Sequence, residues 1–131
     1  MKTLIVEDDF TSSLLLQKIL GAYGPYCLAK DGYQAVEAVR VALNLGKPFD
    51  LICLDIMMPE LDGQAALMQI RDLEKAKGIW SSSGSKVVMT TALGDMKNVA
   101  RAFEGFADAY LTKPIDKTKL LDTLRQLALI K

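Results

Sequence analysis

The chain has 131 residues, about the length of one domain, and half of them are hydrophobic. A compact fold of this length buries roughly two-thirds of the surface of its unfolded chain, which excludes a disordered protein. Sixteen lysines and arginines balance sixteen aspartates and glutamates, so no net charge favours direct binding to a nucleic acid or an anionic membrane. The absence of histidine excludes Ser-His-Asp and Cys-His catalysis and imidazole metal sites.

The two cysteines and the first residues predict where the protein works. Cys27 and Cys53 lack metal-ligand or redox spacing, and a domain of this size needs no disulfide, so both are expected to be reduced. The first apolar run ends at Val6, too early for a signal peptide, and no stretch of 18 apolar residues follows. We therefore expect a soluble, cytoplasmic protein.

In the first half of the chain, short apolar runs alternate with segments of helical period. Residues 4–6 predict a strand, and Leu15, Leu16, Ile19 and Leu20 recur as on one face of a helix. A weaker strand is predicted over 26–29. The helix that follows Asp31 should end near Gly46.

The second half repeats the alternation. Residues 49–54 and 87–89 are apolar on both faces, as in central parallel strands. Asp62 is the predicted N-cap of a third helix, whose inward residues are Ala66, Leu67, Ile70 and Leu73. In the following loop, Trp80 is expected to fold back over the end of that helix. A fourth helix over 95–103, a strand over 109–111 and a helix capped by Asp116 complete the chain.

This order predicts an α/β fold that occupies residues 1–131 as one domain. Strict strand–helix alternation gives a five-stranded parallel sheet, with five helices on its two faces. The expected strand order is 2-1-3-4-5, as in doubly wound, flavodoxin-like folds. In such sheets ligands bind at the carboxyl ends of the strands, near the switch in strand order.

Polar residues stand at four of these strand ends. Glu7 and Asp8 follow the first strand, Asp55 follows the third, Thr91 ends the fourth, and Lys113 ends the fifth. Because strands one and three are neighbours, the three carboxylates should share one pocket. Like charges this close favour a bound cation, and oxygen ligands without histidine or cysteine suit Mg²⁺. The alternative is that the acidic residues only cap a helix or begin a turn.

Taken together, the arrangement resembles the receiver domains of response regulators, in particular single-domain chemotaxis regulators of two-component signalling. The motifs that carry this resemblance are VEDD at 6–9, LDIMMPELDG at 54–63, TTA at 90–92 and YLTKP at 110–114. The resemblance implies that Asp55 is the phosphoacceptor. It also implies that Mg²⁺ is held by Glu7, Asp8, Asp55 and the backbone carbonyl of Met57.

The resemblance extends to the residues that contact and report the phosphate. Lys113 is the phosphate-contacting lysine, followed by a bond to Pro114 that is typically cis in the family. Thr91 is the switch hydroxyl and Tyr110 the rotating aromatic, which together change the surface formed by helix four, strand five and helix five. The alternatives are that Thr91 is an ordinary strand residue and that Tyr110 is an ordinary aromatic at the edge of the core.

Partners follow from the same resemblance. The phosphoryl donor is a histidine kinase or a phosphotransfer protein, which docks on an apolar ring formed by Phe10, Leu15 and Ile115, and an unidentified protein reads the changed surface. At least one leucine among residues 14–16 should touch solvent, because the three span about 200° of a helix. Two apolar side chains beside the site, Met57 and Leu93, predict slow hydrolysis of the phosphate.

Three other functions remain open. These are an intermediate that passes phosphate to another histidine, a flavin-binding protein of the same fold, and a phosphohydrolase that forms an aspartyl phosphate. The acidic loop EDDF argues against flavin phosphate. Met57 stands where such hydrolases place a second aspartate. We therefore expect a switch that catalyses only its own phosphorylation and dephosphorylation, and no other reaction.

Overall fold

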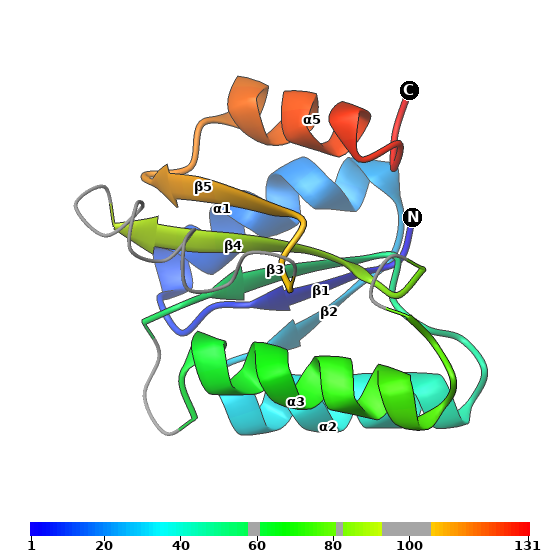
Figure 1. Ribbon diagram of the computed structural model, residues 1–131. Coiled ribbons are helices and arrows are strands. Elements are labelled where there is room, and N and C mark those ends of the chain that lie inside the picture. The colour runs from blue at the N-terminus through cyan, green and yellow to red at the C-terminus, as the bar shows by residue number, and fades with distance from the viewer. Residues whose placement is uncertain (58–60, 81–82, 93–105) are drawn as a thin grey trace.

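The computed structural model describes residues 1–57, 61–80, 83–92 and 106–131. Its strands form one parallel sheet in the order β2-β1-β3-β4-β5, which confirms the predicted flavodoxin-like topology (Figure 1). The strands are β1 (Thr3–Val6), β2 (Tyr26–Ala29), β3 (Leu51–Asp55), β4 (Lys86–Ala92) and β5 (Ala109–Lys113).

Helices cover both faces of the sheet. In Figure 1, α1 and α5 lie on one face, and α2 and α3 lie on the other. Their bounds are Phe10–Leu20 for α1, Gly32–Asn44 for α2, Gly63–Ala76 for α3 and Lys117–Gln126 for α5, and a 3₁₀ turn, Gly21–Tyr23, follows α1. None of these described helices has the length and apolar character needed to cross a bilayer. The helix predicted over 95–103, and Leu93 before it, lie outside the described residues.

Each of the four α-helices in the described part of the chain begins after an aspartate cap. The cap carboxylate accepts a hydrogen bond from the backbone N–H three residues later, which satisfies a donor that the first helical turn leaves free. The pairs are Asp9 with Ser12, Asp31 with Gln34, Asp62 with Ala65, and Asp116 with Lys119. The caps predicted at Asp62 and Asp116 are confirmed. Asp9, and not Asp8, caps the first helix.

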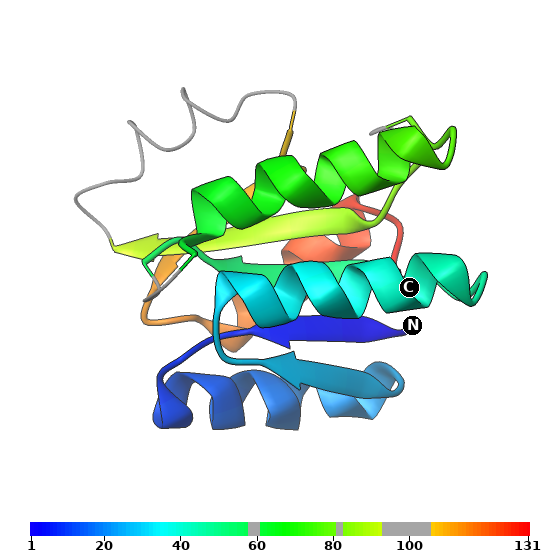
Figure 2. The ribbon, with the colours of Figure 1, turned by 90° about the horizontal axis from the view of Figure 1, so that it is seen from below.

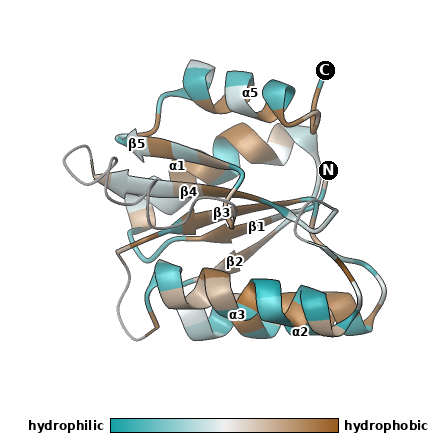
Figure 3. Ribbon diagram, in the orientation of Figure 1, coloured by the Kyte–Doolittle hydropathy of each residue, from teal (hydrophilic) through white to brown (hydrophobic). Residues whose placement is uncertain are grey.

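The core consists of two apolar layers separated by the sheet. Alternate strand residues point to opposite faces, so Leu4 and Ile52 belong to the layer beneath α2 and α3, whereas Ile5 and Cys53 belong to the layer beneath α1 and α5. Figure 3 shows the central strands as the most hydrophobic part of the fold. A sheet buried on both faces explains why the central strand sequences are continuously apolar.

The predicted bounds of the third and fourth strands were wrong by one or two residues. The third strand begins at Leu51, not at residue 49, and includes Asp55, which pairs with Thr90. The fourth continues past Thr91 to Ala92, whereas the fifth ends at Lys113, as predicted. At the carboxyl ends of β3 and β4, the ladder with the neighbouring strand extends each element beyond its apolar run.

Two glycines pack closely against backbone groups that lie near the end of β3 and at Leu61. The N–H of Gly32 donates to the carbonyl of Leu61 at 3.0 Å, and the N–H of Gly63 donates to the carbonyl of Ile56 at 3.1 Å. A Cβ at position 32 would collide with the Leu61 carbonyl, and one at position 63 with the Asp55 carbonyl. Both positions therefore require glycine, and the close contact at Gly63 fixes the backbone at Asp55.

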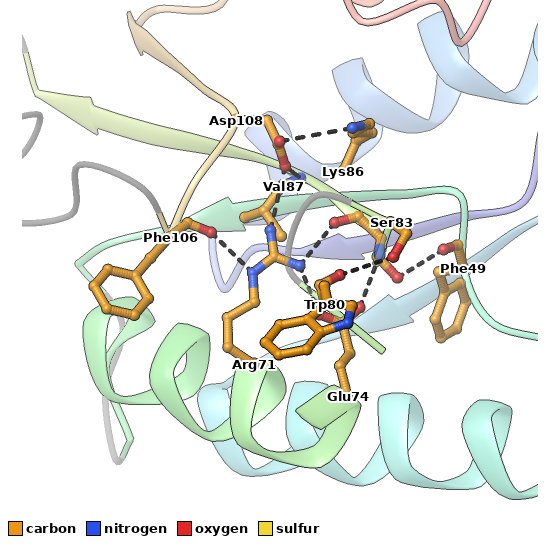
Figure 4. A network of polar contacts seen from close by, with 10 residues as sticks. Phe49, Arg71, Glu74, Trp80, Ser83, Lys86, Val87, Phe106 and Asp108 are labelled. Atoms are coloured by element: carbon orange, nitrogen blue, oxygen red, sulfur yellow. Dashed lines mark hydrogen bonds and ion pairs between the residues drawn. The ribbon is translucent and has the colours of Figure 1, made fainter. Parts of the chain in front are cut away.

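A buried polar network, shown in Figure 4, joins α3 to the amino-terminal ends of β4 and β5. The Arg71 guanidinium donates to Glu74 at 2.7 Å, to Asp108 at 3.2 Å, and to the backbone carbonyls of Phe106 and Ser85 at 2.8 and 2.9 Å. The second oxygen of Glu74 accepts from the N–H of Ser85 at 2.7 Å. Arg71 is 7% exposed and Glu74 is 1% exposed, so both charges depend on these partners.

The expectation for Trp80 was wrong. Its side chain is 75% exposed, and the backbone N–H and the hydroxyl of Ser83 both donate to its carbonyl oxygen (Figure 4). The side chains that are buried near the end of α3 are instead those of Arg71 and Glu74. The apolar periodicity of this helix does not predict that the charged side chains of Arg71 and Glu74 are buried.

We expect Arg71→Met to lower the free energy of unfolding by about 3–5 kcal/mol, because Glu74 then remains buried without a counter-charge. Urea denaturation measures this change. The matched control is Arg40→Met, which breaks an exposed arginine–glutamate pair of the same spacing with Glu37 and should cost less than about 1 kcal/mol. Equal effects of the two substitutions would show that the buried network does not stabilise the fold.

Candidate functional site

Side chains from three strand ends meet at the carboxyl edge of the sheet. Glu7 follows β1, Asp55 ends β3, and Lys113 ends β5. The Lys113 Nζ atom lies 2.9 Å from Glu7 Oε2 and 3.0 Å from Asp55 Oδ2. To do so, its side chain reaches across β4, which separates β5 from β3. One ammonium is thus shared by two carboxylates.

The predicted convergence of three carboxylates is present. One oxygen each of Glu7, Asp8 and Asp55 lies within 4.8 Å of the others. Glu7 and Asp55 are 4% and 3% exposed, whereas Asp8 is exposed to solvent. Such a set of oxygen donors, open on one side, matches the ligand preference of Mg²⁺.

Backbone N–H groups hold both buried carboxylates. The N–H of Met57 donates to Asp55 Oδ1 at 3.1 Å, and the N–H of Asp9 donates to Glu7 Oε1 at 3.2 Å. Asp55 therefore has one oxygen on the backbone and the other on Lys113. The Met57 side chain is 69% exposed. That its carbonyl oxygen is a metal ligand stays a prediction.

Burial and charge pull the pKa values in this site in opposite directions. Burial raises the pKa of Glu7 to about 7; the negative charge of Asp55 adds to the rise, and the hydrogen bond from Lys113 opposes it. Partial burial acts to lower the pKa of Lys113, but its hydrogen bonds to Glu7 and Asp55 outweigh this effect and raise the pKa. The Lys113 side chain therefore carries a positive charge at neutral pH.

Thr91 and Tyr110 lie on the same face of the sheet, as their expected cooperation requires. Met89 pairs with Tyr110 in register, and Thr91 lies two residues beyond Met89, so the two side chains are diagonal neighbours. Tyr110 is half-buried against the core layer that also contains α2 and α3. The Thr91 hydroxyl is buried and has no hydrogen-bond partner within the described ranges. The switch role of the pair stays a prediction.

The residues expected to dock a phosphodonor differ in exposure. Phe10 and Leu15 are 79% and 40% exposed on α1. Ile115 is half-buried and packs against the core layer under α1 and α5. The expectation that a leucine among residues 14–16 touches solvent is confirmed, because Leu14 and Leu15 are both exposed and only Leu16 is buried.

Comparison with known proteins identifies the family. The model of the response regulator receiver domain matches residues 3–125. The chain belongs to the response regulator receiver domain family. Receiver domains are the phosphoacceptor switches of two-component signal transduction. This one is 31% identical to the chemotaxis protein CheY of Treponema pallidum, over 94% of the chain and 79% of that protein.

Other relatives are longer, and solved structures agree with the fold. The receiver domain is 35% identical to the transcriptional regulator RpaA of Synechocystis over 96% of the chain, but it spans only 48% of that protein. It resembles a chain of the CheX–CheY–BeF3–Mg²⁺ complex of Borrelia burgdorferi, with a TM-score of 0.79, 28% identity, and coverage of 100% and 90% of the two chains. In the yeast Ypd1–Ssk1 receiver complex the corresponding values are 0.79, 30%, 96% and 87%.

The raised pKa of Glu7 predicts how stability depends on pH when a chelator removes divalent cations. Between the ordinary value of 4.5 and about 7, the folded receiver domain binds a proton that the unfolded chain releases, so the free energy of unfolding falls as pH rises. Glu7→Gln removes this titration. The variant should gain at least about 1.4 kcal/mol relative to wild type between pH 5 and pH 8, the equivalent of one pKa unit.

Urea denaturation of both proteins at the two pH values measures this difference, with Glu37→Gln as a control at an exposed glutamate. A stability difference between Glu7→Gln and wild type that does not change with pH would contradict the raised pKa.

Proposed function

We propose that Asp55 accepts a phosphoryl group from a phosphohistidine of a histidine kinase or phosphotransfer protein. The observation that carries this proposal is the Lys113 ammonium bound to Glu7 and Asp55 at the ends of three parallel strands. The protein of this family solved with the phosphotransfer protein Ypd1 supports the class of donor. We propose the activity and the partners of the whole protein on the same grounds.

The chemistry balances with the groups present. An Asp55 carboxylate oxygen attacks phosphorus, the phosphorus–nitrogen bond of the donor breaks, and its electron pair returns to the imidazole ring. The product is an acyl phosphate on Asp55. A carboxylate nucleophile has no proton to lose, so no general base is needed. Lys113, already 3.0 Å from Asp55 Oδ2, is positioned to donate to a phosphoryl oxygen and to offset its charge.

A magnesium ion fits this donor set. Glu7, Asp8, Asp55 and the backbone carbonyl of Met57 would hold it, and the convergence of the three carboxylate oxygens supports this assignment. When bound, the ion neutralises negative charge on the transferred group. The protein contributes to metal binding by keeping three carboxylates close together. Two of them are buried and accept hydrogen bonds from backbone N–H groups.

Thr91 and Tyr110 are the residues that report the phosphate. The buried Thr91 hydroxyl, which lacks a partner among the described residues, is a donor available to a phosphoryl oxygen. Its movement toward Asp55 would leave space beside Tyr110, and the ring would turn into that space. The resulting change alters the surface around β5 and α5, which a downstream protein reads.

We infer a cytoplasmic switch that catalyses no reaction beyond its own phosphorylation and dephosphorylation. Both cysteines are free thiols, which agrees with a reducing compartment. An intermediate that passes the phosphate to another histidine would use the same Asp55 chemistry, and a partner decides between the two. Slow hydrolysis of the aspartyl phosphate stays a prediction. Of the two apolar residues on which it rests, Met57 is exposed two positions after Asp55, and Leu93 lies outside the described residues.

Acetyl phosphate tests the acceptor directly. We expect intact mass spectrometry to show one phosphoryl adduct on the wild-type protein with Mg²⁺, and at least a tenfold lower yield with a chelator, because the buried negative charges then oppose the reaction. Asp55→Asn should carry no adduct, whereas Asp72→Asn, an exposed aspartate of α3, should react as wild type. A phosphate adduct that survives in Asp55→Asn would refute the assignment.

Docking is tested at the exposed end of α1. Phe10→Asp should slow phosphotransfer from a cognate kinase or phosphotransfer protein at least tenfold, equivalent to ~1.4 kcal/mol, because it places a charge in an apolar contact. The rate with acetyl phosphate should not change. Met68→Asp, at a similarly apolar exposed position on α3, is the control. Equal slowing with both donors would mean that Phe10 acts on the site and not on docking.

A further inference from the structure

A groove runs beside α2, at the edge of the sheet formed by β2. Its volume is about 650 Å³, within the range of protein binding sites. Its apolar wall comes from one side of α2 and from Phe49, two residues before β3. The residues of this wall are Tyr33, Ala38, Val41, Ala42, Leu45 and Phe49.

This side of α2 is apolar in addition to the side that faces the core. The buried stripe of the helix contains Ala35, Val39 and Ala42. Outside it, Tyr33 is 60% exposed and Leu45 is 69% exposed, although both are large hydrophobic residues. Helices that bury a single face do not need this second stripe, and contiguous exposed apolar residues mark interaction sites.

The sheet offers the other wall of the groove. Figure 2 shows β2 lying outside the layer formed by α2 and α3. On β2, Cys27 is exposed and lines the groove. A helix beside α2, at the usual separation of 8–10 Å, would cover this face of β2 in the way that α2 and α3 cover the strands next to it.

The charges of the groove favour an anionic group on its occupant. Glu37 is already neutralised by its ion pair with Arg40. The Lys2 ammonium donates to the carbonyl of Lys47 at 2.7 Å and lies 4.6 Å from the centre of the Phe49 ring. It forms no ion pair with a carboxylate of the described residues. The Asp50 carboxylate accepts a hydrogen bond from the backbone N–H of Lys2 at 2.7 Å but is not among the residues that line the groove. Among the lining residues, the charge left without an ion pair is therefore positive, and it lies at the Lys2 end.

The length of the groove favours a helix over a small molecule. The groove-lining residues run from Tyr33 of α2 to its C-cap, Leu45, and at 1.5 Å per residue this stripe is roughly 18 Å long. Three to four turns of helix match that length. We propose that the groove binds an amphipathic helix of a partner protein, with apolar residues against α2 and an acidic side chain facing Lys2.

This site is separate from the proposed phosphoacceptor. The groove belongs to the β2 edge of the sheet, whereas the proposed switch lies on β4 and β5 at the other edge. The test therefore uses the Asp55→Asn protein alongside the wild type. A result that is the same in both proteins bears on the groove whether or not Asp55 is the phosphoacceptor.

Cys27 supplies a reporter that needs no label. Cys53 is fully buried and burial raises its pKa to about 12, so an alkylating agent should modify Cys27 alone. The probe is a side-chain-stapled helical peptide of about four turns, with one leucine stripe and a glutamate at the end that would meet Lys2. A twin peptide carries glutamine in place of that glutamate.

We expect the glutamate peptide to slow iodoacetamide modification of Cys27 at least tenfold at saturation, as followed by intact mass spectrometry. The concentration for half-protection should rise at least tenfold in Leu45→Asp, and at least threefold with Lys2→Met or with the glutamine twin. Met68→Asp, on α3 outside the groove lining, should leave it unchanged. Near-ultraviolet circular dichroism identifies any variant that fails to fold.

Three results would overturn the proposal. Absence of protection at millimolar peptide, or equal protection in Leu45→Asp, would show that the groove does not bind a helix. Equal half-protection by the two peptides would refute the acidic partner. Protection that appears on raising the protein concentration alone, or with octanoate alone, would identify a second copy of the chain or a small apolar acid as the occupant.

Discussion

The interaction on which the site depends is the contact of one ammonium with two buried carboxylates. Glu7 and Asp55 are almost completely removed from water, and side by side their negative charges repel in a medium of low dielectric constant. Lys113 lies within 3.0 Å of both and offsets this repulsion. The same burial that makes the two carboxylates costly also favours the binding of further cations beside them. A bound divalent cation would offset the negative charge that Lys113 leaves uncompensated.

The rest of the fold holds these three side chains in place. Parallel strands deliver their carboxyl ends to one edge, and the required glycine at position 63 fixes the turn directly after Asp55. At the amino-terminal ends of the strands, the Arg71 network connects α3 to the beginnings of β4 and β5. Because Lys113 ends β5, the register of that strand decides whether its side chain reaches Asp55. Rigid elements at both ends of the sheet thus position a small reactive centre.

The sequence was sufficient for the topology and for the convergence of carboxylates, since both follow from apolar periodicity and from where polar residues interrupt it. It was insufficient where a charged residue is buried. Arg71 and Glu74 look like exposed helix residues, and their burial depends on carbonyl groups of distant segments. Trp80 was misplaced for the same reason. The second apolar stripe of α2 was also missed, because a pattern of spacing does not distinguish residues that face the core from residues that face an open groove.

The measurement that tests the central claim most directly is the stability of Lys113→Met in the presence of a chelator. If the ammonium offsets the repulsion of Glu7 and Asp55, this substitution should lower the free energy of unfolding by at least about 1 kcal/mol. Adding Asp55→Asn to the same protein should restore most of that loss, because only one buried negative charge remains. A Lys113→Met protein as stable as wild type, or one that Asp55→Asn does not rescue, would contradict the account.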